Sequence, residues 1–162
     1  GSGIPFTILK PHYFMQNLMM AAQSVAQQGA IYFALADGKM GLIDSRDISD
    51  FAAHVLTTAG HEGKTYTLTG PASLSMHQIA AAIGAAIGKT VTYVAVPVEG
   101  ARQSMAQMGM DDWMVNLMCD YFTAYSANWG DLVTDDFQRV TGKAPRSLEQ
   151  FARDFARAFG KQ

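Results

Sequence analysis

Residues 75–96 constrain the fold most, because a helix start, a helix end and a strand follow one another there. Ser75 and Gln78 have the spacing of a capping box, in which each side chain satisfies a free backbone donor. Apolar residues then repeat at helical spacing, at Met76, Ile79, Ile83 and Ile87. Gly88 is typical of a helix end, and the β-branched run Val91–Val96 is typical of a strand. A helix followed at once by a strand predicts mixed α and β structure.

The remaining chain repeats this alternation of short strands with helices. Strands are predicted at 6–9 and 66–69, with further short apolar runs at 30–36 and 40–43. Helices are predicted at 15–28, from Asp44 to near Gly60, at 98–108, at 110–125 and from Ser147 onward. A length of 162 residues suits one domain, so we expect residues 1–162 to form a single helix-rich α/β domain.

The composition argues against several classes of protein. The net charge is −2 and no run of Lys or Arg is present, which argues against binding to nucleic acid. No apolar stretch is long enough to cross a membrane. The single cysteine, Cys119, excludes an internal disulfide and fits a reducing, cytoplasmic compartment. Charged residues make up only 16% of the chain, so we expect apolar surface that meets a partner.

Five segments, taken in order, carry a family resemblance. They are SGIPFTILKPHYFMQN (2–17), GLIDSRDISDFAAHVL (41–56), GHEGKTYTLTGPASLSMHQIAAAIGAAIGK (60–89), VTYVAVP (91–97) and TGKAPRSLEQFARDFARAF (141–159). Together they resemble the NmrA-like family of atypical short-chain dehydrogenases/reductases, which includes NAD(P)H-quinone reductase-like proteins. The resemblance covers nearly the whole chain but only the family's C-terminal half. It implies a truncated Rossmann-type fold that lacks the N-terminal dinucleotide-binding half.

No stretch of residues 1–162 has the glycine-rich pattern that binds a dinucleotide in such a fold. The glycines of that loop let the backbone approach the pyrophosphate at a helix N-terminus. Gly60–Thr65 resembles the end of a P-loop, but Thr58 stands where glycine is needed. Gly84–Thr90 is one residue short and leads into a strand. We therefore predict no cofactor, because NAD(P) is not expected to bind without this loop.

The resemblance also implies which residues line a substrate pocket. In the family, the segment that matches Lys10–Asn17 lies beside the nicotinamide and the substrate. Tyr13, Phe14 and Asn17 are therefore expected to line the pocket. The Met-rich segment after Pro97 is expected to cover the substrate, and it contributes the lining residues Trp113 and Tyr121.

His12 is the candidate for general acid–base catalysis. It follows Pro11 at the C-terminal end of a predicted strand, where open α/β sheets bind their ligands. An imidazole at such a place can titrate near neutral pH. The alternative is a histidine hydrogen-bonded within a loop.

A metal site is not favoured by the sequence. Asp47, Asp50 and His54 share roughly one face of a predicted helix, and His61 follows shortly after. If a divalent ion such as zinc were bound, Asp50, His54 and His61 would be its ligands. We favour the alternative, in which the carboxylates stabilise the helix N-terminus and His54 is exposed.

The methionines suggest a deformable apolar surface. The chain contains ten methionines, many of them between 105 and 118 or between 15 and 20. Such a surface can form plain core, a pocket for a small apolar ligand or a contact between subunits.

The predicted strand at 6–9 would be an edge strand if its neighbour in the complete fold is absent. An open edge exposes unpaired backbone groups that another chain can pair with. We therefore expect a homodimer or higher oligomer that forms through this edge.

Three functions remain open at this stage. The first is a substrate-side binding or interaction module that cannot transfer hydride alone. The second is a hydrolase of activated esters or phosphate esters, with or without a metal, that uses a cleft formed on oligomerisation. The third is an ordinary NAD(P)-dependent reductase whose other half is a separate chain. We expect the first.

Overall fold

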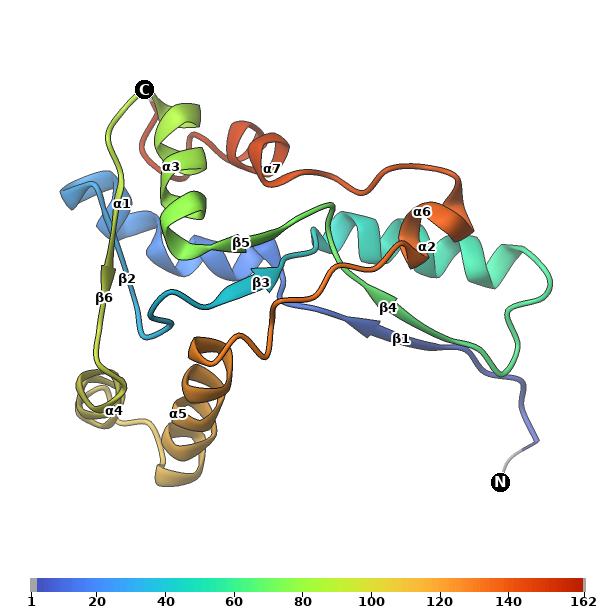
Figure 1. The fold of residues 1–162 in the computed structure, drawn as a ribbon, viewed down its shortest axis with the longest axis horizontal. Helices are drawn as coiled ribbons and strands as arrows, with labels where there is room; N and C mark the ends of the chain where they lie inside the picture. Colours follow the sequence, from blue (N-terminus) through green and yellow to red (C-terminus); the bar gives the residue numbers. More distant parts are fainter. Residues whose placement is uncertain (1–2, 162) are drawn as a thin grey trace.

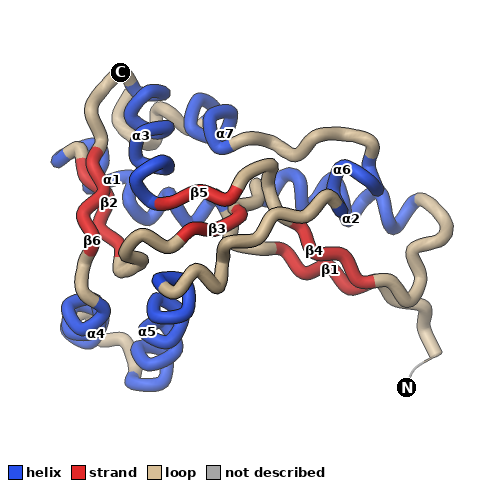
Figure 2. Tube along the Cα trace, viewed as in Figure 1, coloured by secondary structure: helices blue, strands red, loops and turns tan. Residues whose placement is uncertain are grey.

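The structure is a computed structural model that describes residues 3–161. Short strands alternate with helices along the chain, as Figure 1 and Figure 2 show. The strands are β1 (Ile8–Pro11), β2 (Ala30–Phe33), β3 (Lys39–Gly41), β4 (Thr65–Leu68), β5 (Ser73–Ser75) and β6 (Thr92–Ala95). A 3-10 helix, η1 (Met15–Ala21), precedes α1 (Ala22–Gln28). The later helices are α2 (Ser45–Thr57), α3 (Met76–Ile87), α4 (Val98–Gln107), α5 (Asp112–Ser126), α6 (Asp136–Thr141) and α7 (Leu148–Asp154). The prediction of a helix-rich α/β fold is confirmed.

The described strands form three pairs. β1 lies parallel to β4 with Leu9 opposite Tyr66, and β2 lies parallel to β6 with Ile31 opposite Tyr93. β3 and β5 are antiparallel. In Figure 1 the β1–β4 pair lies on the right with α2 and α6, and the β2–β6 pair lies on the left with α1 and α3. Parallel pairing requires crossover connections, and helices supply them here.

Two clusters of buried side chains hold these groups together. The larger cluster joins η1, α1, β2, α3, α5 and α7. The smaller cluster packs α2 and α6 against the β1–β4 pair and contains Ile43, Phe51, Tyr66, Leu68 and Phe137. Cys119 is buried on α5 as a free thiol.

The helix-end signals in the sequence are confirmed. Ser75 and Gln78 form the complete capping box at the start of α3. Gly88 ends α3 with a φ of 71°, in the left-handed region that glycine adopts at low cost. The apolar stripe of α3, from Met76 to Ile87, is buried. Asp44 caps α2 by accepting a hydrogen bond from the Arg46 backbone N–H.

The first strand lies two residues later than predicted. The strand was expected at 6–9, but β1 covers Ile8–Pro11 because its register with β4 fixes its limits. Phe6 lies outside the strand and is 62% exposed. The Thr7 hydroxyl donates to the His61 carbonyl oxygen at 2.8 Å, which holds the segment before β1 in place.

Three further elements differ from the sequence prediction. The helix expected at 15–28 begins as the 3-10 helix η1, since the Asn17 N–H donates to the Phe14 carbonyl oxygen. β5 was not predicted, and it forms only by pairing with β3. The last helix ends at Asp154 rather than continuing toward Phe159. In residues 3–161, no helix is long and apolar enough to span a membrane.

Candidate functional site

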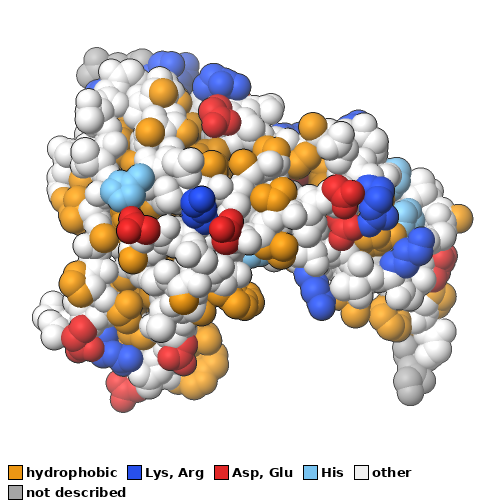
Figure 3. Space-filling model, in the orientation of Figure 1, with side chains coloured by type: hydrophobic (Ala, Val, Ile, Leu, Met, Phe, Trp, Pro, Cys, Tyr) orange, Lys and Arg blue, Asp and Glu red, His pale blue; other side chains and the backbone are white. Residues whose placement is uncertain are grey.

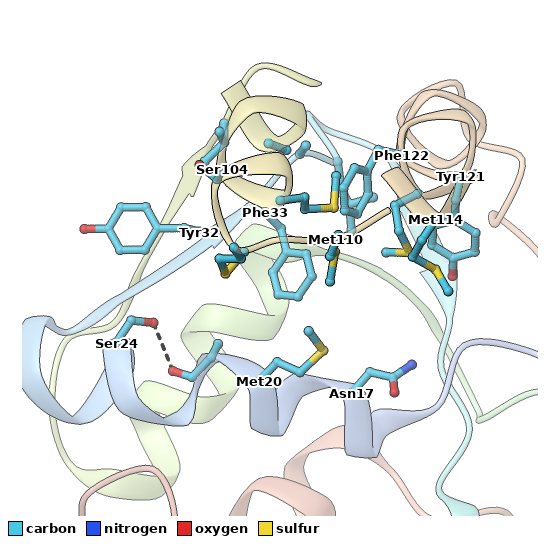
Figure 4. Close-up of a pocket in the computed structure, with 18 of the residues that line it drawn as sticks. Asn17, Met20, Ser24, Tyr32, Phe33, Ser104, Met110, Met114, Tyr121 and Phe122 are labelled. Atoms are coloured by element: carbon cyan, nitrogen blue, oxygen red, sulfur yellow. Dashed lines mark hydrogen bonds between the residues drawn. The ribbon is translucent and has the colours of Figure 1, made fainter. Parts of the chain in front are cut away.

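A large pocket opens between η1, α1, β2 and the pair of helices α4 and α5. Its volume is about 770 Å³, within the range typical of small-molecule sites. Figure 4 shows side chains from these separate elements converging on it. We call it the methionine pocket. It is lined by Tyr13, Asn17, Met20, Ala21, Ser24, Tyr32, Phe33, Ala34, Leu35, Val96, Ala101, Ser104, Met105, Met108, Met110, Met114, Met118, Tyr121 and Phe122.

Six of the ten methionines in the chain line this one pocket. Thioether side chains are flexible and polarisable, so they can adapt to ligands of different outline. The aromatic rings of Phe33 and Phe122 add flat apolar surface. The helical spacing of Met114, Met118 and Tyr121 turns all three toward the pocket from one face of α5. This wall suits a planar apolar molecule.

Tyrosines from two segments meet at the pocket wall. The rings of Tyr121 and Tyr125 stack with centroids 4.2 Å apart, and the Tyr13 ring lies 6.3 Å from that of Tyr121. Burial raises the pKa of Tyr13 to about 12, and the nearby Tyr125 adds to this shift. Burial, and then hydrogen bonding to Tyr125, also raise the pKa of Tyr121. These phenols therefore stay protonated at neutral pH and can donate hydrogen bonds.

His12 does not line the methionine pocket. Its ring packs against Trp129, with centroids 6.3 Å apart, and against Tyr125 at 5.9 Å. Burial lowers the pKa of the imidazole, and a hydrogen bond with the Gly41 backbone opposes this shift. Nδ1 is buried without a hydrogen-bond partner among residues 3–161. A catalytic role for His12 stays a prediction.

The structure brings some of the predicted pocket residues together and leaves others apart. Tyr13, Asn17 and Tyr121 line the methionine pocket. Phe14 and Trp113 do not line it, and their side chains are 39% and 69% exposed. The sequence reasoning missed the contribution of β2, whereas the segment after Pro97, which includes α4, was expected to cover the substrate. The methionines between 105 and 118 already suggested a pocket for a small apolar ligand, and Met105, Met108 and Met110 line the methionine pocket.

Two residues of the alternative metal site, Asp50 and His61, are engaged elsewhere, and the His54 ring lies 5.8 Å from that of His61. Asp50 Oδ2 lies 3.0 Å from Nη1 of Arg146. His61 Nδ1 lies 2.8 Å from the Tyr66 hydroxyl, and its Nε2 lies 2.9 Å from that of Thr58. Within the described part of the chain, no group of three or more His, Cys, Asp or Glu side chains could hold a metal ion.

The fold is that of a helix-rich α/β protein with a large apolar pocket. The chain belongs to the NmrA-like family, whose sequence model matches residues 1–151. It is 40% identical over 159 residues to an NAD(P)H azoreductase of Xenophilus azovorans, covering 98% of this chain and 56% of that protein. It is 36% identical over 149 residues to the uncharacterized oxidoreductase YesF of Bacillus subtilis, covering 91% of this chain and 52% of that protein.

The structural comparison agrees with the sequence comparison. The fold is similar to that of an NADPH-dependent quinone oxidoreductase of Escherichia coli, with a TM-score of 0.82 and 26% identity. The likeness covers 95% of this chain and 56% of that protein. The chain thus spans about half the length of the relatives it matches.

These relatives correct the function expected from sequence. A binding module without hydride transfer was expected, with an ester hydrolase as the alternative, and both were wrong. The matched relatives are an NAD(P)H azoreductase and oxidoreductases, which supports a reductase. The error came from giving too much weight to the missing glycine-rich pattern in residues 1–162. The glycine-rich loop determines how pyrophosphate is held, whereas the site for an electron acceptor depends on other residues.

The described residues fit one end of a nicotinamide dinucleotide and not the other. The methionine pocket offers flat apolar surface for a ring, but no Lys or Arg lines it to meet a pyrophosphate. The closely packed glycines Gly38, Gly41 and Gly70 face backbone carbonyls of this same chain rather than an open cradle. Within residues 3–161, the methionine pocket therefore offers apolar surface and no cationic side chain for a phosphate.

Proposed function

We propose that this chain is the acceptor-side part of an NAD(P)H-dependent reductase that acts on flat apolar acceptors. The observation that carries the proposal is the methionine pocket, which has about 770 Å³ of space and a wall of thioethers and aromatic rings. The relatives support the reaction class, since they include an NAD(P)H azoreductase and a quinone oxidoreductase.

The chemistry of the wall suits acceptors such as azo compounds and quinones. Aromatic side chains favour offset or edge contacts with a flat ring, and thioethers make favourable contacts with ring edges. The reduced nicotinamide supplies a hydride when it is bound. The part of this chain is to bind the acceptor and to keep water away from it.

The proposal includes an assignment of domain. We take residues 1–162 to correspond to the C-terminal, substrate-side portion of a Rossmann-type NmrA-like reductase. The likeness over nearly all of this chain but about half of each relative supports this assignment.

A chimera tests the function directly. This chain would replace the segment of the Xenophilus azovorans azoreductase to which it aligns. The purified chimera is expected to consume NADPH only when an azo dye or a quinone is added. The consumption is followed by the loss of NADPH absorbance and by the bleaching of the dye.

Two controls make the result interpretable. Circular dichroism and NADPH binding establish that the chimera is folded and holds its cofactor. The same chimera with Met114→Arg, which places a charge in the apolar wall, is expected to bind NADPH but to lose most dye reduction. A folded chimera that binds NADPH and reduces no acceptor would overturn the proposal.

A further inference from the structure

Three of the polar side chains at the methionine pocket already donate hydrogen bonds to residues three or four positions earlier in the chain. Ser24 and Ser104 each donate to a carbonyl oxygen of the same or the adjoining helix at 3.0 Å. The Tyr32 hydroxyl donates to Gln28 Oε1 at 2.9 Å, and Figure 4 shows this hydroxyl turned away from the pocket. These three groups have little left to offer a ligand.

Three other polar side chains remain for a ligand: Tyr13, Asn17 and Tyr121. Within residues 3–161, neither the Asn17 amide nor the Tyr13 hydroxyl has a side-chain hydrogen bond, although Tyr13 is only 9% exposed. The Tyr13 hydroxyl and the Asn17 amide are therefore free to hydrogen-bond with a ligand in the pocket. The Tyr121 hydroxyl interacts with that of Tyr125. Because a hydroxyl hydrogen can rotate, Tyr121 can instead donate to a ligand in the pocket.

These three side chains gather at one end of the pocket. The Tyr13 and Tyr121 rings are 6.3 Å apart, and Asn17 lies on η1 just after Tyr13. In Figure 4 the polar atoms of Asn17 and Tyr121 lie at the same end, whereas Met20, Phe33 and Met110 occupy the middle. The pocket therefore has a polar end (Tyr13, Asn17 and Tyr121) and an apolar body.

The polar end carries no charge. Among residues 3–161, no Lys, Arg, His, Asp or Glu side chain lines the pocket. An anionic group placed there would lose its hydration without gaining a cation, and this is costly. A neutral acceptor such as a carbonyl oxygen loses less hydration and gains hydrogen bonds from the amide and the phenols.

We propose that Tyr13, Asn17 and Tyr121 form a hydrogen-bonding subsite that selects ligands with a neutral acceptor atom at one end of a flat apolar body. The inference rests on the proposed function, because it takes the methionine pocket to be the acceptor site. It goes further in naming the side chains that discriminate, and in excluding ligands that would place an anion at the polar end.

Binding of three small probes to the purified chain tests the subsite. Naphthoquinone carries carbonyl groups, naphthalene carries none, and naphthalenesulfonate carries an anion. Affinities are measured by isothermal titration calorimetry for the wild type and for the variants Asn17→Leu and Tyr121→Phe. In each variant, the affinity for naphthoquinone is expected to fall about three- to tenfold, and the affinity for naphthalene is expected to change less than about twofold. The wild type is expected to bind naphthalenesulfonate at least about tenfold more weakly than naphthalene.

Gln27→Leu is the matched control for Asn17→Leu, since it replaces an exposed amide on the neighbouring helix α1 that does not line the pocket. It is expected to leave all three affinities unchanged. Circular dichroism and the thermal midpoint of each variant establish that it is folded. Tyr121→Phe keeps the ring that stacks on Tyr125, so a general loss of packing is not expected.

The outcomes separate this inference from the proposed function. The subsite proposal is wrong if Asn17→Leu and Tyr121→Phe change the affinities for naphthoquinone and naphthalene equally, or change neither affinity. In that case the proposed acceptor pocket is not contradicted. Tight binding of naphthalenesulfonate would overturn the selection against anions. If the wild type binds none of the probes, the pocket is not an acceptor site and both proposals fall.

Discussion

The Asp47 carboxylate binds Arg146, which lies 99 residues further along the chain, through both its side chain and its backbone. The Arg146 N–H donates to Asp47 Oδ2 at 2.7 Å, and the guanidinium pairs with Oδ1 of the same carboxylate. The Asp47 side chain is 2% exposed and that of Arg146 is 29% exposed. One carboxylate in the first turn of α2 thus holds the segment that leads into α7.

Removal of this carboxylate is expected to destabilise the fold. Asp47→Ala leaves the Arg146 N–H without its acceptor and the guanidinium without its buried partner. We expect the free energy of unfolding in urea to fall by about 2–4 kcal/mol. Asp50→Ala removes the exposed partner of the same guanidinium and is expected to cost less than about 1 kcal/mol. Equal losses in the two variants would contradict the importance of the buried contact.

Asp44 is expected to make the protein sensitive to acid. Burial alone would raise the pKa of this carboxyl, but hydrogen bonds from Arg46 and Gln16 lower it below its usual value. The unfolded chain then binds more protons than the folded chain near pH of about 4, so stability rises with pH there. The contribution is complete above the unfolded pKa and is lost as pH falls through the lowered folded value.

Urea unfolding at a series of acidic pH values checks this expectation. The free energy of unfolding of Asp44→Asn should depend less steeply on pH than that of the wild type. Asp120→Asn changes an exposed carboxyl on α5 and should keep the wild-type slope. Identical slopes for Asp44→Asn and the wild type would show that Asp44 is not responsible.

Gly41 is expected to tolerate no side chain. A Cβ at this position would lie 2.0 Å from the Leu132 carbonyl oxygen, because the segment after α5 packs directly on β3. Gly41→Ala must displace that backbone, and we expect a loss of about 1–3 kcal/mol in the thermal unfolding free energy. Gly100→Ala, in α4, meets only Val96 Cγ1 at 3.4 Å and should be neutral or stabilising by up to about 1 kcal/mol. A wild-type melting temperature for Gly41→Ala would contradict this packing.

Oxidation of methionine is expected to weaken ligand binding in the methionine pocket. Met20 and Met108 are 77% and 70% exposed, so dilute peroxide should reach them before the buried Met40, which is 0% exposed. Conversion to the sulfoxide makes the wall polar and should weaken naphthalene binding. Peptide mass spectrometry and calorimetry on the same samples measure the two effects. A variant with Met20→Leu and Met108→Leu should retain more of its binding after peroxide, and loss equal to that of the wild type would contradict the assignment.

The open edge of β1 is expected to mediate association between chains. Among the described strands β1 pairs with β4 alone, and Ile8 is 43% exposed. Figure 3 shows the molecule hollowed below this strand, with apolar side chains at the rim. We expect a homodimer in sedimentation velocity that Ile8→Lys weakens. Leu56→Lys, which changes an apolar residue on α2 that is 84% exposed, is the control. A compact monomer at micromolar concentration would contradict the expectation.

The sequence located part of the candidate site, and the reason is physical. The family resemblance pointed to Tyr13 and Asn17, which follow β1 directly, at the strand end where α/β folds bind ligands. Tyr121 lies on a helix in which the spacing of the methionines already indicated an apolar face. Trp113 belongs to the same helix, but its side chain leaves the other face and is exposed. A spacing rule cannot decide which face of a helix meets a distant strand.

The sequence alone determined where most helices begin and end. Ser75, Gly88 and Asp44 act on backbone groups within a few residues, so their effect does not depend on the rest of the fold. The tertiary structure decided the remainder. β5 exists only against β3, and the methionine pocket needs walls from β2 and from helices far along the chain. Contacts between such distant segments depend on how whole elements pack, and no local pattern of residues records that packing.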